Sequence, residues 1–142
     1  MGILGEKKIS DTVGVYVHIP YCLSKCPYCD FKSVVSKELP EESYAGCVLT
    51  ELSSLLRKEE ALSGKPLESV YIGGGTPSLF SPLTIGRIIR SVRSSFAPFK
   101  NEIEITIEVN PDGAAPERLK GYREAGANRL SIGVQSLSDA EL

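Results

Sequence analysis

The sequence predicts an α/β fold with about four parallel strands and flanking helices, arranged as the first half of a partial (β/α) barrel. Two observations carry this prediction. Along the chain, segments in which apolar and polar residues alternate, as in strands, are each followed by a segment whose apolar residues have helical spacing. Repeated strand–helix units of this kind build parallel sheets with right-handed crossovers. Several strands also carry polar residues on one face, which is typical of a wall around a ligand-sized interior.

The expected elements follow one another in a regular order. The first strand, 13–19, alternates strictly between apolar odd-numbered residues and a second face with Tyr16 and His18. A helix over about 40–58 follows, with apolar residues at helical spacing and with Glu41 and Glu42 in its first turn, where they suit the helix dipole. The pattern then repeats as strand 69–72, helix 82–96, strand 102–109, helix 116–125 and strand 128–134.

The last two expected strands divide their residues between an apolar and a polar face. The polar faces carry Glu102, Glu104, Thr106, Glu108 and Asn110 in the first of them, and Arg129, Ser131, Gly133 and Gln135 in the second. Glu108 and Gln135 stand at inward strand ends, where parallel sheets bind ligands. Arg129 has Glu102 and Glu104 as candidate ion-pair partners.

Composition limits the classes of function. The 142 residues are 42% apolar, which is the makeup of one soluble globular domain. Sixteen basic and eighteen acidic residues are scattered along the chain, so no footprint for nucleic acid is present. Residues 1–10 lack the apolar stretch of a signal peptide, and no run approaches the roughly 18 apolar residues of a membrane span. We therefore expect a cytoplasmic protein, whose four cysteines stay reduced.

The two ends of the chain carry a prediction about domains. Residues 1–12 are expected to form an N-terminal extension, and residues 13–142 the N-terminal half of a barrel domain. The segment 138–141 has the S-x-x-E form of a helix capping box, with only Leu142 after it. Four parallel strands also cannot close a barrel. The sequence is therefore expected to be a truncated part of a larger domain.

Three cysteines directly after the first strand form a candidate metal centre. Cys22, Cys26 and Cys29 follow a strand end, where α/β proteins place their chemistry. Soft thiolates select zinc, copper(I) or iron–sulfur clusters. A structural zinc needs four protein ligands, whereas three thiolates on a 4Fe–4S cluster leave one iron free for a substrate or cofactor. We therefore expect a 4Fe–4S cluster.

Other interpretations of these residues stay open. A zinc site with three cysteines and His18, the only histidine, would make the chain a zinc-stabilised structural module. Cys47, alone on the first helix, is expected to be a small buried hydrophobic residue. The glycines at 73–75 end a strand and bring backbone amides close to a carboxylate or phosphate, or they form only a tight turn. No Gly-Lys-Ser or Gly-Lys-Thr follows them, which excludes a Walker A loop.

The cysteine spacing C-x-x-x-C-x-x-C, with Tyr28 before the third cysteine, resembles the radical S-adenosylmethionine (SAM) superfamily. Four longer motifs resemble its oxygen-independent coproporphyrinogen III oxidase family. They are YVHIPYC from Tyr16, YIGGGTPS from Tyr71, TIEVNPD from Thr106 and NRLSIGVQS from Asn128. The resemblance implies a radical-SAM (β/α) partial barrel, of which this chain holds the first half.

The resemblance also implies the residues that bind cofactors. Cys22, Cys26 and Cys29 ligate the 4Fe–4S cluster, and the free iron chelates SAM. The residues implied at the SAM site, or for the last one at a second cofactor or substrate position, are Tyr16, Tyr28, Gly74, Gly75, Thr76, Glu108 and Gln135. No side chain is implied as a catalytic acid or base, because the radical chemistry is performed by the cofactor itself.

One sequence position separates two functions within this family. Its dehydrogenases have a fourth cysteine two residues after the third, and a long N-terminal arm. Here that position is Phe31, and about a dozen residues precede the first strand. Both departures resemble the heme chaperone branch, which implies heme delivery to an acceptor protein, an electron donor, and membrane association only through an acceptor. The alternative is a coproporphyrinogen III oxidase (dehydrogenase) of porphyrin biosynthesis, so enzymatic activity stays open.

Overall fold

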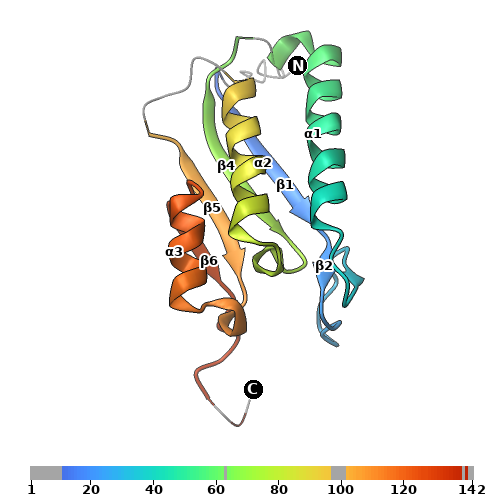
Figure 1. Cartoon of the computed structure of the whole chain (residues 1–142), viewed down its shortest axis with the longest axis vertical. Helices are drawn as coiled ribbons and strands as arrows, with labels where there is room; N and C mark the ends of the chain where they lie inside the picture. The colour runs from blue at the N-terminus through green and yellow to red at the C-terminus, as the bar shows by residue number, and fades with distance from the viewer. Residues whose placement is uncertain (1–10, 63, 97–101, 139, 141–142) are drawn as a thin grey trace, which may run out of the picture.

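The structure, a computed structural model, describes residues 11–62, 64–96, 102–138 and 140. Its main sheet has four parallel strands in the order β1–β4–β5–β6. These are β1 (Val13–Ile19), β4 (Leu67–Gly74), β5 (Glu104–Val109) and β6 (Arg129–Ile132). The helices α1 (Glu41–Lys58), α2 (Pro82–Ser95) and α3 (Pro116–Glu124) connect these strands and lie on one face of the sheet (Figure 1). The predicted α/β fold is confirmed.

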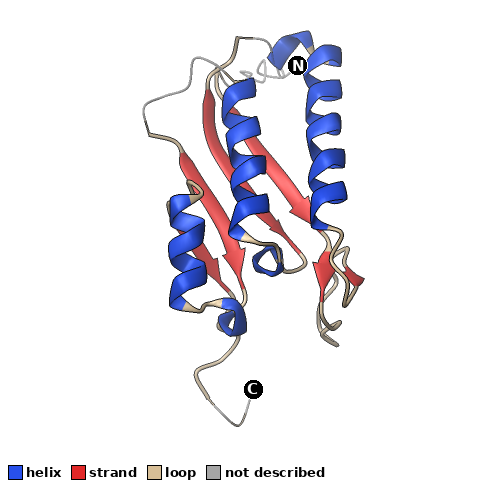
Figure 2. Cartoon of the chain, viewed as in Figure 1, coloured by secondary structure: helices blue, strands red, loops and turns tan. Residues whose placement is uncertain are grey.

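Some boundaries differ from the sequence prediction. β4 is longer at both ends than 69–72, β5 begins at Glu104 rather than at 102, and β6 ends at Ile132 rather than at 134. Two short strands, β2 (Tyr21–Cys22) and β3 (Val34–Val35), pair with each other beside the main sheet (Figure 2). The 3-10 turns are η1 (Glu60–Leu62), η2 (Pro77–Leu79) and η3 (Pro111–Gly113). Residues 1–10, and two of the four residues of the expected capping box (139 and 141), lie outside the described residues.

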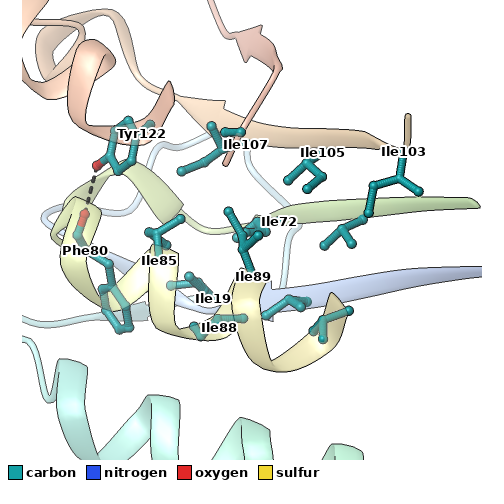
Figure 3. Close-up of a cluster of buried hydrophobic side chains, with 14 of the residues drawn as sticks. Ile19, Ile72, Phe80, Ile85, Ile88, Ile89, Ile103, Ile105, Ile107 and Tyr122 are labelled. Atoms are coloured by element: carbon teal, nitrogen blue, oxygen red, sulfur yellow. Dashed lines mark hydrogen bonds between the residues drawn. The ribbon is translucent and has the colours of Figure 1, made fainter. Parts of the chain in front are cut away.

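The hydrophobic core lies between the sheet and the helices. The apolar face of β5 is buried as predicted, with Ile105 and Ile107 at most 1% exposed. α2 covers it with three isoleucines that are equally buried (Figure 3): Ile85, Ile88 and Ile89. Burying each such side chain contributes about 1.5–3 kcal/mol. None of the helices that the structure describes lies over the opposite face of the sheet, which carries exposed Tyr16, so the polar face is the open one.

A buried tyrosine on α3 fixes the turn η2 that follows β4. The Tyr122 hydroxyl shares its hydrogen between the carbonyl oxygens of Ser78 at 2.9 Å and Phe80 at 2.8 Å, the latter drawn in Figure 3. It also accepts a hydrogen bond from Arg118 Nε, and a second Arg118 nitrogen donates to the Leu79 carbonyl. Burial raises the pKa of Tyr122, so this hydroxyl keeps its proton. Tyr122 and Arg118 of α3 therefore fix the turn η2, which follows the glycine run.

Glu41 joins the first turns of α1 and α2. Its Oε2 accepts hydrogen bonds from the Ser81 N–H and hydroxyl and from the Thr84 hydroxyl. Burial works to raise the pKa of Glu41, but these hydrogen bonds and the Arg118 charge outweigh it and hold the pKa below its ordinary value. The sequence suggests that Glu41 suits the dipole of its own helix, whereas the structure shows it bonded to the start of the neighbouring one.

Candidate metal and cofactor site

The cysteines lie on a loop at the carboxyl ends of the strands. The loop follows β1 and lies beyond the carboxyl end of the sheet, beside the end of β4 (Figure 1). The β2–β3 pairing closes the loop near its base, where the Val34 N–H donates to the Pro20 carbonyl at 2.7 Å and the Ser36 N–H to the Cys22 carbonyl at 3.0 Å. The loop is thus closed at its base by a pairing that includes Cys22, and Cys26 and Cys29 lie within the closed segment.

A lysine between the first two cysteines binds across the loop. Lys25 Nζ donates to the Phe31 carbonyl at 2.7 Å and to the Ser33 hydroxyl at 3.0 Å. A turn closed by the Cys29 N–H and the Cys26 carbonyl, 3.1 Å apart, links the other two cysteines. All three thiols are free, and Cys26 is exposed. These hydrogen bonds therefore hold the backbone of the loop in place, while its sulfur atoms stay available as metal ligands.

The end of β4 touches the first cysteine. Gly75 and Thr76 donate their N–H groups to the carbonyls of Ile19 and Tyr21, each at 2.8 Å, and the Thr76 hydroxyl lies 3.5 Å from the Cys22 sulfur. A Cβ on Gly75 would lie 2.8 Å from that sulfur. The glycine leaves the space beside the thiol open.

The glycine run does not present its amides to a ligand in this structure. The Gly74 N–H donates to Glu108 Oε2 at 3.0 Å, and the amides of Gly75 and Thr76 are held by the carbonyls just described. Gly74 has a φ of 123°, and a Cβ there would lie 2.8 Å from the Ile19 carbonyl oxygen, so both conformation and space require glycine. The run therefore allows close approach of β1 and β4.

Glu108 lies at the end of β5 with both carboxylate oxygens engaged. Its Oε1 accepts from the Tyr71 hydroxyl at 2.8 Å, and its Oε2 accepts from the Gly74 amide. The Tyr16 ring stacks on the Tyr71 ring, with centroids 6.0 Å apart. Burial, followed by the negative charge of Glu108, raises the pKa of Tyr16. The predicted residues Tyr16, Gly74 and Glu108 are thus brought together on the open face of the sheet.

His18 links the sheet to the cysteine loop. Its Nε2 lies 2.9 Å from the Lys32 carbonyl oxygen, which only accepts, so Nε2 carries the hydrogen. In the neutral ring Nδ1 is then the acceptor of the Tyr16 hydroxyl, 3.0 Å away. A zinc site with His18 as its fourth ligand would have to break one of these bonds, so this geometry disfavours that alternative.

The three thiols fit a cluster better than a single ion. Within the described ranges, no three His, Cys, Asp or Glu side chains converge as the ligands of one metal ion do. A 4Fe–4S cluster takes each thiolate at a separate iron, which sets the sulfur atoms further apart. Soft donors that share one loop, form no disulfide and have open space beside Cys22 are the donor set of such a cluster.

Of the remaining predicted residues, Tyr28 lies beside Cys26 in the cysteine loop and Gln135 lies after the end of β6. Tyr28 is 70% exposed, and its pKa is raised, mainly by its hydrogen bond with the Cys26 side chain. Gln135 follows the end of β6 with a φ of 67°, and its side-chain amide donates to the Gly133 carbonyl at 3.1 Å. The strand face therefore does not continue to Gln135.

Two further predictions have clear outcomes. Arg129 pairs with Glu104 at 3.2 Å, as one of its two expected partners. The prediction that Cys47 is buried is wrong. Cys47 is exposed, because α1 turns Ala45 rather than Cys47 into the core.

Sequence reasoning missed Tyr71 and Lys25. Tyr71 shares the polar face of the sheet with Gly73 by strand alternation and pairs with Thr106 of β5, two residues before Glu108. Knowledge of this pairing between β4 and β5 would have placed the Tyr71 hydroxyl near Glu108. Nothing in the local pattern around Lys25 indicates that its side chain folds back across the loop.

Fold and site define an α/β protein whose candidate cofactor residues lie at the carboxyl ends of four parallel strands. The family model described as the radical SAM superfamily matches residues 16–141, and the chain belongs to this superfamily. Membership implies a 4Fe–4S cluster and SAM as the cofactors of such domains in general. Within the residues that the structure describes, no helix has both the length and the apolar character to span a membrane.

The chain is similar to several named proteins. It is 42% identical over 132 residues to the heme chaperone HemW of Haemophilus influenzae, covering 92% of this chain and 34% of that protein. It is also 42% identical to the bovine mitochondrial radical SAM domain-containing protein 1, covering 94% and 29%. Among solved structures, the coproporphyrinogen III oxidase HemN of Escherichia coli matches with a TM-score of 0.73 and 30% identity, covering 91% and 29%. The chain spans about a third of the length of these relatives.

Proposed function

We propose that the protein is a heme chaperone of the radical-SAM type, which binds a 4Fe–4S cluster and SAM and delivers heme to acceptor proteins. The observation that carries the proposal is Phe31, which occupies the position of the dehydrogenases' fourth cysteine. Its side chain is 66% exposed and offers no thiol beside the candidate cluster site. The similarity to proteins named heme chaperone HemW supports the same choice.

The cysteine loop is proposed to hold the cluster. Cys22, Cys26 and Cys29 would each donate a thiolate, while Lys25 and the β2–β3 pairing keep the loop closed. When bound, such a cluster supplies electron transfer to a cofactor at its free iron. Thr76 would donate a weak hydrogen bond to the Cys22 sulfur.

The strand ends are proposed to hold SAM. The residues assigned to the SAM site, or for the last one to a second cofactor or substrate position, are Tyr16, Tyr28, Gly74, Gly75, Thr76, Glu108 and Gln135. Because the amides of Gly74 to Thr76 already have acceptors, the site suits a cationic or hydroxyl-bearing group better than an anion. The Glu108 carboxylate is the matching acceptor for an ammonium or a ribose hydroxyl.

The second candidate function is that of a coproporphyrinogen III dehydrogenase. The observation in its favour is the likeness of the fold to E. coli HemN. The fold alone does not separate the two functions, because the same barrel hosts different chemistry at its loops. The residue at position 31 and the names of the more similar relatives favour the chaperone.

Two assays on one preparation separate the candidates. Protein expressed from the complete coding sequence and reconstituted anaerobically should bind heme in a spectral titration. It should also fail to convert coproporphyrinogen III to protoporphyrinogen IX in the presence of SAM and a reductant. Turnover of coproporphyrinogen III would contradict the chaperone proposal, and so would the absence of heme binding.

The proposal includes partners and a place of action. A chaperone of this type needs a heme-acceptor protein, and an electron donor to reduce its cluster. We propose that it acts in the cytoplasm and meets a membrane only through its acceptor. A pull-down with heme-loaded protein and detection of transferred heme on the captured partner tests this part.

A further inference from the structure

We propose that Tyr71 is a positioning residue that fixes the Glu108 carboxylate for ligand binding, and that Gly73 provides the space in which the two side chains meet. This inference rests on the proposed function, in which Glu108 contacts SAM. It gives Tyr71 a positioning role and Gly73 a steric role, neither of which the sequence motifs assign to them.

The geometry around Glu108 leaves little freedom to its side chain. One carboxylate oxygen accepts from the Tyr71 hydroxyl at 2.8 Å and the other from the Gly74 amide at 3.0 Å. The two donors come from one strand, β4, and the acceptor comes from its neighbour, β5. A carboxylate has about four lone-pair sites, so two remain for a ligand. Both oxygens are thus oriented while part of their accepting capacity stays open.

Gly73 makes this arrangement sterically feasible. Tyr71 and Gly73 lie on the same face of β4, because they are two residues apart in a strand. A Cβ on Gly73 would lie 2.9 Å from Tyr71 Cε1 and 3.0 Å from Glu108 Oε2. Both distances are shorter than ordinary van der Waals contacts, so any side chain here would push the tyrosine and the carboxylate apart.

The Tyr71 ring is itself held in place. The Tyr16 ring stacks on it at an interplanar angle of 27°, and the Tyr16 hydroxyl bonds to His18. Tyr71 therefore stands between a fixed aromatic ring on β1 and the carboxylate on β5. A donor whose own rotamer is locked by packing orients its acceptor better than a mobile one does.

A double-mutant cycle on SAM binding tests the inference. The variants are Tyr71→Phe, Glu108→Ala and the combination, each reconstituted anaerobically and titrated with SAM by calorimetry. Removing the Tyr71 hydroxyl should weaken SAM binding by roughly three- to tenfold, the scale of one hydrogen bond to a charged group. In the Glu108→Ala background the same change should have no further effect, because Tyr71 acts through Glu108. Gly73→Ala should weaken binding like Tyr71→Phe.

The controls separate positioning from general damage. Iron content should stay at the wild-type value in Tyr71→Phe, and its unfolding should remain cooperative. Ser53→Ala, which removes a hydroxyl that bonds to the Leu49 carbonyl within α1, should leave SAM affinity unchanged. Unchanged affinity in Tyr71→Phe, or an equal loss in both Glu108 backgrounds, would overturn the positioning role alone. Unchanged affinity in Glu108→Ala would overturn the SAM site of the proposed function together with this inference.

Discussion

The Thr76 hydroxyl lies 3.5 Å from the Cys22 sulfur and joins the end of β4 to the cysteine loop. The contact depends on Gly75, whose N–H holds the Ile19 carbonyl at 2.8 Å. The glycine run and the cysteine motif are separate in the sequence, but they form one junction in space. A change at this junction should therefore affect the metal site directly.

Gly75→Ala should cost the protein most of its iron. The new Cβ would lie 2.8 Å from the Cys22 sulfur and equally close to the carbonyl oxygens of Pro20 and Tyr21, and backbone atoms cannot move aside easily. We expect a loss of about 1–3 kcal/mol in stability, typical of overpacking. The matched control is Gly46→Ala on α1, which meets nothing within 4 Å and should keep its iron. Equal iron in both variants would contradict the junction.

Lys25→Met should shorten the lifetime of the cluster. The change removes the two hydrogen bonds that Lys25 makes across the loop, to the Phe31 carbonyl and the Ser33 hydroxyl, while keeping a side chain of similar length. Transfer of iron to a chelator should become several times faster, since each lost bond is worth about 1 kcal/mol. Exposed Lys37 gives the control variant Lys37→Met. A chelation rate that is the same in both variants would show that the bonds across the loop are unimportant.

Glu41→Gln should lower stability at neutral pH and lose its effect in acid. The folded-state pKa of Glu41 is lowered, so the carboxylate stabilises the fold fully above its unfolded pKa of about 4.3, and the contribution disappears as the pH falls through the folded pKa. Denaturant unfolding of both proteins between pH 7 and pH 3 measures this. Glu42→Gln, at a 71% exposed side chain, should show a smaller difference. A wild-type advantage that persists unchanged at pH 3 would contradict the assignment.

The sequence predicted the fold because its signals are regular. Strand alternation at 13–19 and the apolar spacing of 82–96 both follow the period of their element, and both elements are found. β2 and β3 have two residues each, too few for any periodicity, so only the pairing within the loop reveals them. β6 is shorter than predicted, and its Leu130 and Ile132 are exposed at the edge of the described sheet.

The site was predictable only where a motif carries it. The cysteine triplet and Glu108 could be named from spacing and strand alternation. Tyr71 was missed because its role depends on register with a strand more than thirty residues away. The exposure of Cys47 was missed because helix orientation is set by packing against the sheet and not by the residue itself.

The most direct test of the account is the measurement of iron and acid-labile sulfide after anaerobic reconstitution. The wild-type protein should contain about four of each per chain. Cys22→Ala, Cys26→Ala and Cys29→Ala should each lose the brown chromophore and most of both elements, whereas Cys47→Ala should match the wild type. Equal loss in all four variants, or stoichiometric zinc in place of iron and sulfide, would contradict the assignment of a 4Fe–4S cluster to Cys22, Cys26 and Cys29.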